Sequence, residues 1–269
     1  MQKKKMVKRV RNHKILNRPI VAFILLMLWG YVFYQIIGSI FLISLGDNYL
    51  GYGAAVGAII ALVIHKAWFS PEFKGSIGIP KFRSKDIKYA YFLLTSVTVV
   101  IDLIPLVENG YSFSFVSLGT ALMAGIGEEM FVRALPISVM MRDWMDDKHI
   151  PFITYSTAII FGLIHLINLT GGESLGDTLA QVVVATGMGV MFGACYIRTG
   201  NILLCMLLHT AHDMLNFMLV DVTDSVWVSY DMITSIIIGV IGIAVGTYLI
   251  RKSVRADIVE VWKERWNQD

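Results

Sequence analysis

Long apolar segments are the feature that most restricts what this chain can fold into. An α-helix of about 20 apolar residues crosses the hydrocarbon core of a bilayer, and lipid tolerates no unpaired backbone there. Segments of this length are therefore typical of membrane-spanning helices. Polar turns separate eight of them, which we expect at 19–45, 51–68, 88–108, 113–141, 151–168, 177–198, 201–220 and 227–250.

Composition supports this interpretation. Of the 269 residues, 56% are apolar and only 16% are charged, and the mean hydropathy is +0.65. A soluble core of this size could not bury so much apolar surface, so the remainder must face lipid. The sequence predicts an all-α, polytopic membrane protein. It would have a basic tail at 1–18, a transmembrane domain at 19–250 with a motif-bearing core at 85–220, and a tail at 251–269.

The distribution of basic residues predicts the orientation of the spans. If the N-terminus lies inside, the tails and inward-facing connections carry 22 of the 23 Lys and Arg residues. Cytoplasmic loops are enriched in Lys and Arg, so both termini and the loop at 69–87 are expected in the cytoplasm. The first apolar segment is too long for a signal-peptide core and is expected to remain as an anchor.

Other features have simpler interpretations. Cys195 and Cys205 fall in predicted spans, where we expect small core residues rather than a disulfide framework. The C-terminal tail has apolar residues at Val254, Ile258, Val261, Trp262 and Trp266, a spacing that fits an amphipathic helix at the membrane interface.

Charged groups within the fourth predicted span need an explanation, because they cost several kcal/mol at mid-bilayer. Glu129 and Arg133 are four residues apart, so they share a helix face and are expected to pair. Glu128 points about 100° away from Glu129 on an α-helix and must find a partner on another helix. Purely structural acids would be expensive here, which favours a functional role.

Two other spans carry imidazoles. Phe161 and His165 lie on one face of the fifth span. In the seventh, the spacing of four residues pairs His209 with Asp213 and, beside them, His212 with Asn216. A lone histidine is more often a core residue, but two histidines and an aspartate within one and a half turns are hard to explain as packing.

Counting residues from the cytoplasmic end of each span places some of these groups at the same depth in the membrane. At 1.5 Å per residue, Glu128 and His165 each lie about 21 Å from the cytoplasmic face. His209 comes out at about 12 Å, which is shallower by nearly two turns. Asp102 lies near the outer end of the third span, and we do not expect it to belong to the site.

A carboxylate beside an imidazole can hold and deprotonate water, and a second imidazole can stabilise an oxyanion. Peptide hydrolysis needs these parts. Glu128 with His165 would supply the activated water, and His209 with Asp213 the oxyanion site. The same residue types could instead bind zinc with an open position for water.

These three motifs, Glu-Glu-x-x-x-Arg at 128–133, Phe-x-x-x-His at 161–165 and His-x-x-x-Asp at 209–213, resemble those of the CAAX protease and bacteriocin-processing (Abi) family. These are intramembrane proteases related to the type II CAAX prenyl endopeptidase. The resemblance implies a glutamate-dependent endopeptidase that needs no cofactor, although zinc stays open. It implies that Glu128 and His165 activate water, that His209 and Asp213 form the oxyanion site, and that Glu129 and Arg133 brace the span.

One position departs from the family. Members that act on prenylated proteins usually have Asn where this chain has Asp213. The resemblance therefore favours peptide processing, bacteriocin immunity or secretion in a bacterial cell membrane. The expected partners are a membrane-associated peptide or protein and the lipid bilayer, with no nucleic acid.

Two other functions remain open from sequence. A non-catalytic immunity or scaffold protein could keep the same fold without activity. A proton-coupled transporter also uses buried Glu, His and Asp, but it predicts internal repeats or broken helices, and no repeat is visible.

Overall fold

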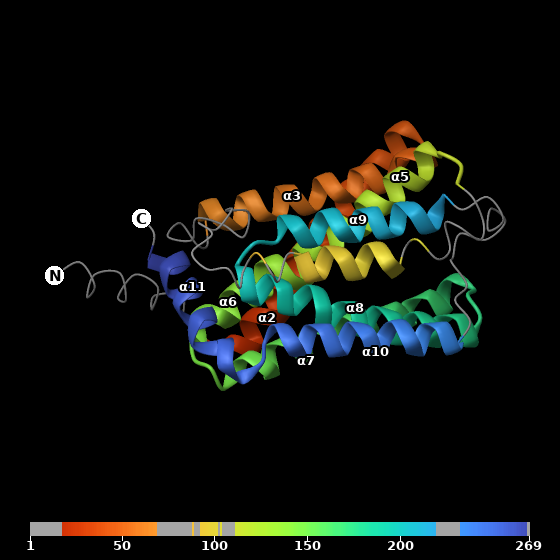
Figure 1. Ribbon diagram of the computed structural model, residues 1–269. Helices are drawn as coiled ribbons and strands as arrows, with labels where there is room; N and C mark the ends of the chain where they lie inside the picture. Colours follow the sequence, from red (N-terminus) through yellow and green to blue (C-terminus); the bar gives the residue numbers. More distant parts are fainter. Residues whose placement is uncertain are drawn as a thin grey trace.

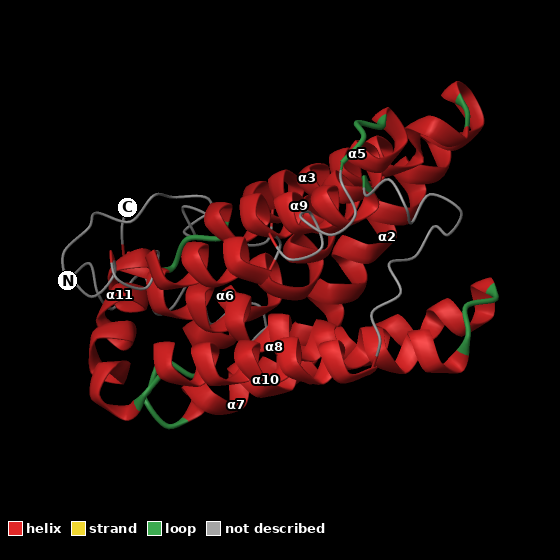
Figure 2. Ribbon diagram, turned by 45° about the vertical axis from the view of Figure 1, so that its right-hand side comes forward, coloured by secondary structure: helices red, strands yellow, loops and turns green. Residues whose placement is uncertain are grey.

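The computed structural model describes residues 18–68, 88, 92–101, 103, 111–218 and 232–267, and within them it contains helices and no β-strand (Figure 2). The predicted all-α class is confirmed. The tail at 1–17, the loop at 69–87 and Asp102 lie outside these residues.

Six helical segments among the described residues are long and apolar enough to cross a membrane, which confirms a polytopic membrane protein. Several contain more than one element. They are α2 (Pro19–Leu45); η1 (Asp47–Tyr49) with α3 (Leu50–Trp68); α5 (Phe115–Leu122), η2 (Met123–Ala134) and α6 (Leu135–Asp143); α7 (His149–Ile164) with η3 (His165–Gly171); α8 (Leu175–Thr199); and α10 (Met232–Leu249).

The other two predicted spans correspond to shorter described helices. The segment expected at 201–220 contains α9 (Leu203–Phe217), whose 15 residues extend for only about 22 Å. The segment expected at 88–108 contains a helix at Phe92–Ile101. Within these two segments, residues 89–91, 102, 104–108 and 219–220 are outside the described residues, so the count of eight and the orientation of the termini stay predictions.

The helices pack in two groups that meet around the motif-bearing segment. α8 lies against α7 and α10 in one group, and α2 packs on α3 in the other (Figure 1). η2 contacts both α3 and α9, while α5 also packs on α9. This arrangement brings η2, which carries Glu128 and Glu129, beside the helix that carries His209.

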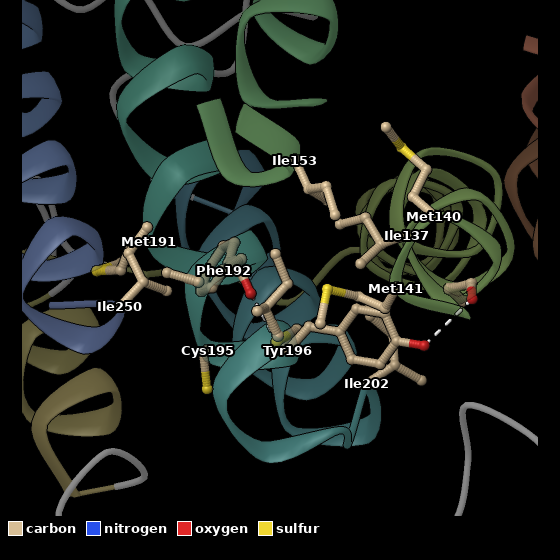
Figure 3. Packing of buried hydrophobic residues seen from close by; sticks show 14 of the residues in the cluster. Ile137, Met140, Met141, Ile153, Met191, Phe192, Cys195, Tyr196, Ile202 and Ile250 are labelled. Atoms are coloured by element: carbon tan, nitrogen blue, oxygen red, sulfur yellow. Dashed lines mark hydrogen bonds between the residues drawn. The ribbon is translucent and has the colours of Figure 1, made fainter. Parts of the chain in front are cut away.

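Many of the buried side chains of the core lie on α8. Phe192 and Tyr196 of this helix are almost completely buried, and the Tyr196 hydroxyl donates to the carbonyl of Ala134 at 3.2 Å. Figure 3 shows these side chains packed with Ile137 and Met141 of α6. Both cysteines are buried and free, as expected for small core residues.

The segment that carries the first motif is a π-helix rather than the α-helix assumed from sequence. Pro136 follows it at the start of α6. Proline has no N–H group and its ring clashes with the carbonyl four residues earlier, so the α-helical hydrogen-bond ladder is interrupted at this point. Wider turns of this kind are rare and recur at functional sites.

The tail after α10 does form a helix, α11 (Arg255–Asn267), which follows the short turn η5 (Lys252–Val254). Its apolar face is not turned toward lipid, however. Trp262 is fully buried, and its indole N–H donates to the carbonyl of Ile197 at 2.8 Å. α11 instead packs on α8 and α6, at the left end of the bundle in Figure 1.

Candidate active site

Glu129 and His209 join the first and third motifs directly. Glu129 is fully buried, and one of its carboxylate oxygens, Oε1, pairs with Arg133 on the next turn of its own helix. The same oxygen lies 2.9 Å from Nδ1 of His209, on α9. The predicted pair of Glu129 with Arg133 is confirmed, and the contact with His209 is an addition that sequence spacing did not reveal.

Aromatic rings surround the buried Arg133. Its guanidinium lies over the ring of Phe161, 4.5 Å from the centroid, and 5.9 Å from the centroid of Phe192. A cation above an aromatic face is stabilised by the ring quadrupole, and this effect strengthens when water is excluded. Phe161 therefore links the second motif to the first, while Phe192 has no motif that would have predicted its role.

The third motif has the two side-chain pairs that its spacing predicts. Nε2 of His209 lies 3.6 Å from Oδ2 of Asp213, which is too long for a strong hydrogen bond. Asn216 donates from Nδ2 to the carbonyl of His212 at 2.8 Å and also lies 3.4 Å from its ring. Asp213 therefore faces His209 without fixing its Nε2.

The second motif orients His165. This residue follows the last residue of α7 and begins the 3-10 helix η3. Its Nδ1 lies 2.9 Å from the carbonyl oxygen of Phe161, so this nitrogen carries the proton that is donated. In the neutral ring, Nε2 is then the nitrogen left to accept a proton.

Glu128 lines a cavity of about 730 Å³ and is partly exposed to it. Histidines from two helices share this cavity, as do most of the other predicted site residues. The wall includes Glu128, Phe161, His165, His209, His212, Asp213 and Asn216. The structure thus gathers the three motifs around one cavity, while Glu129 and Arg133 lie buried behind it.

The predicted depth mismatch between the motifs is not found. The count placed His209 nearly two turns closer to the cytoplasmic face than Glu128 and His165, yet all three line the same cavity. The count assumed that every helix begins at the same membrane depth and is regular. η2 is a π-helix, so the assumption of regular helices fails.

Tyr34 of α2 is a further neighbour of the site that the motifs did not indicate. Its ring lies against Gly127, where an added Cβ would overlap it, and it also lines the cavity. It packs edge-on against Phe131, with ring centroids 5.4 Å apart. In the sequence, only the presence of a tyrosine within an apolar segment pointed to a role for Tyr34, and this is a weak indication.

Among the residues that the structure describes, no group of three or more His, Cys, Asp or Glu side chains is placed to hold a metal ion. Metal dependence stays a question for chelation experiments.

Comparison with known proteins supports the resemblance. A family model described as type II CAAX prenyl endopeptidase Rce1-like matches residues 110–215, a range that contains all three motifs. Neither the curated proteins nor the solved structures gave a match. Residues 110–215 are therefore similar to the CAAX protease (CPBP) family, and the six long apolar helices are those of a multi-pass membrane protein.

Proposed function

We propose that this protein is an intramembrane endopeptidase in which Glu128 and His165 activate a water molecule. The observation that carries the proposal is the convergence of Glu128, His165 and His209, from three helical segments, on one cavity. Its substrate would be a membrane-associated peptide or protein, in peptide processing, bacteriocin immunity or secretion. The site of action would be a bacterial cell membrane.

In the proposed reaction Glu128 takes up a proton and later returns it, while His165 and His209 keep one role each. Water, polarised by Glu128 and by Nε2 of His165, attacks the carbonyl carbon of the scissile peptide bond, and Glu128 accepts its proton. The carbonyl π electrons move to oxygen and form an oxyanion, which His209 stabilises. The tetrahedral intermediate collapses, the C–N bond breaks, and Glu128 returns the proton to the leaving nitrogen. The products are a carboxylic acid and an amine.

The position of His209 suits the oxyanion role. Glu129 accepts from Nδ1–H, so the ring is held in one orientation while Nε2 points toward Asp213 and the cavity. With a carboxylate near each nitrogen, the ring can carry a proton on both. Because the contact with Asp213 is long, the Nε2–H is available to a developing negative charge.

Comparative peptidomics of membranes containing wild-type or Glu128→Ala protein tests the proposal. We expect peptides that appear only with the wild type, and a loss of their formation in the variant. A scaffold protein would keep its cellular effect after this substitution. Lys263→Ala is a matched control, because this exposed lysine of α11 pairs only with Glu260 in the described structure.

Chelation separates the glutamate mechanism from the zinc alternative. If Glu128 and His165 activate water without a metal, incubation with a strong chelator should leave the rate of peptide hydrolysis unchanged. Loss of activity on chelation, with recovery on adding zinc, would show that a metal activates the water instead.

A further inference from the structure

The cavity wall carries a second set of polar side chains besides the carboxylates and imidazoles. On α2, Gln35 donates from Nε2 to the hydroxyl of Tyr31 at 2.7 Å. Between η3 and α8, Asn168 donates from Nδ2 to Oε1 of Gln181 at 2.6 Å. All four residues line the same cavity as Glu128.

Each of these amides keeps unused hydrogen-bonding capacity. A side-chain amide offers two N–H donors and a carbonyl acceptor, and each pair uses only one N–H. Among the described residues, no further partner occupies the carbonyls of Gln35 and Asn168 or the amino group of Gln181. Gln35 is exposed, whereas Asn168 and Gln181 are partly buried. In an apolar span, unused polar groups such as those of Asn168 and Gln181 are costly unless an occupant both donates and accepts hydrogen bonds.

The chemistry of the wall indicates which occupant would satisfy these groups. A peptide main chain alternates N–H donors with carbonyl acceptors, and an extended segment satisfies none of them internally. A lipid acyl chain offers neither. The rest of the wall is largely apolar and includes Met27, Leu28, Leu50, Met123, Val184 and Met188, which suit uncharged apolar side chains.

We propose that Gln35 with Tyr31 on one wall, and Asn168 with Gln181 on the other, bind the main chain of an extended apolar peptide segment. These contacts would hold the scissile bond against Glu128. The cleavage part of this inference rests on the proposed function, whereas the binding part does not. The two hydrogen-bonded pairs would be substrate-positioning sites that recognise the backbone rather than a prenyl group.

Binding to a Glu128→Gln protein tests the inference without cleavage. The probe is a set of short, fluorescently labelled, uncharged peptides of Leu, Val, Ala and Ser, and the protein is held in phosphatidylcholine nanodiscs. Adding Gln35→Leu or Gln181→Leu should weaken binding by about fivefold each, which is the fold-change expected for one lost hydrogen bond. Thr120→Val is the matched control, because this cavity hydroxyl already donates to the carbonyl of Val116.

A second probe guards against variants that fold poorly. The same peptides with N-methylated main-chain amides should bind the Glu128→Gln cavity several-fold more weakly. Gln181→Leu should then have little additional effect, because the hydrogen bonds are already lost. If the Leu variants bind the unmethylated peptides as tightly as their parent does, or if no peptide binds, the cavity does not recognise a main chain.

Cleavage by the wild type distinguishes this inference from the proposed function. Amide-dependent binding without any hydrolysis would overturn the endopeptidase and leave the peptide site standing. Hydrolysis with an unchanged KM in both Leu variants would overturn the peptide site and leave the endopeptidase standing.

Discussion

Glu129 shows how one buried carboxylate connects two helices. It accepts from Arg133 in its own helix and from Nδ1 of His209 across the interface with α9. A buried charge is tolerated only with such partners, and removing one leaves the other uncompensated. We therefore expect Glu129 to fix His209 without touching the substrate.

The first prediction separates stability from activity at this cluster. Arg133→Met should destabilise the protein by about 3–5 kcal/mol, because Glu129 is left buried and without its cation. Glu129→Gln combined with Arg133→Met should recover much of this loss, since both members of the buried ion pair are then removed together. Thermal unfolding in detergent measures the stability.

Peptide hydrolysis provides the second half of that test. The double variant should stay slow, because the carboxylate that anchors His209 is gone. Equal recovery of stability and of kcat would show that Glu129 only supports packing.

The second prediction concerns Asp213, the position that departs from the family pattern. Asp213→Asn should keep hydrolysis within about tenfold, because its amide can still lie beside Nε2 of His209 and can donate to an oxyanion. Asp213→Leu removes this polar partner and should lower kcat by roughly 10²-fold or more. A Leu variant with wild-type kcat would remove Asp213 from the site.

At the scale of elements, the contact between η2 and α9 sets the distance between Glu129 and His209. Gly125 of η2 faces the backbone of Thr210, one residue after His209. A Cβ at this position would overlap that backbone, so the two helices can approach this closely only because the residue is glycine.

The third prediction follows from this close approach. Gly125→Ala should push α9 away and cost about 1–3 kcal/mol through overpacking. Because His209 moves with α9, kcat for peptide hydrolysis should also fall, even under conditions in which the variant stays folded. Gly193→Ala in α8 is the control, since its Cβ would lie 3.9 Å from Thr157 Oγ1, an ordinary contact distance. If both variants behave alike, the helix contact does not control the site.

These elements also show where sequence reasoning succeeds and where it fails. The length of the apolar segment and the turn residues predicted α2 at 19–45 with matching bounds. The spacing of four residues predicted the pairs Glu129–Arg133 and His209–Asp213. Both are local properties of the chain.

Nonlocal contacts were out of reach of the sequence. Nothing in the spacing shows that Glu129, rather than Glu128, bonds to His209, because that choice depends on how η2 and α9 cross. The π-helical turns also alter the angles that were calculated for an α-helix. Phe192 has its place beside Arg133 only because α8 packs in the centre of its group.

At the scale of the whole molecule, α11 connects the end of the chain to the helices of the site. Trp266 donates from its indole N–H to the carbonyl of Ser138, which is 128 residues away and lies in α6. Arg198 of α8 donates to the carbonyl of Val254, just before α11. η5 and α11 therefore connect α6 to the last turn of α8, and α6 continues directly from η2.

The fourth prediction tests this connection. Trp262→Ala should destabilise the protein by about 3–5 kcal/mol, because the side chain is fully buried and its N–H is bonded to Ile197. Lys263→Ala, at the exposed neighbouring position, should change stability by less than about 0.5 kcal/mol. Equal unfolding temperatures would mean that α11 does not support the bundle.

The central claim is that Glu128 activates water inside the bilayer. The most direct measurement is the rate of peptide hydrolysis by purified wild-type and Glu128→Gln protein in nanodiscs, with products identified by mass spectrometry. Glutamine keeps the shape but cannot accept the proton, so kcat should fall roughly 10²–10⁴-fold with the fold unchanged. A Glu128→Gln protein that hydrolyses the same bond at the wild-type rate would contradict it.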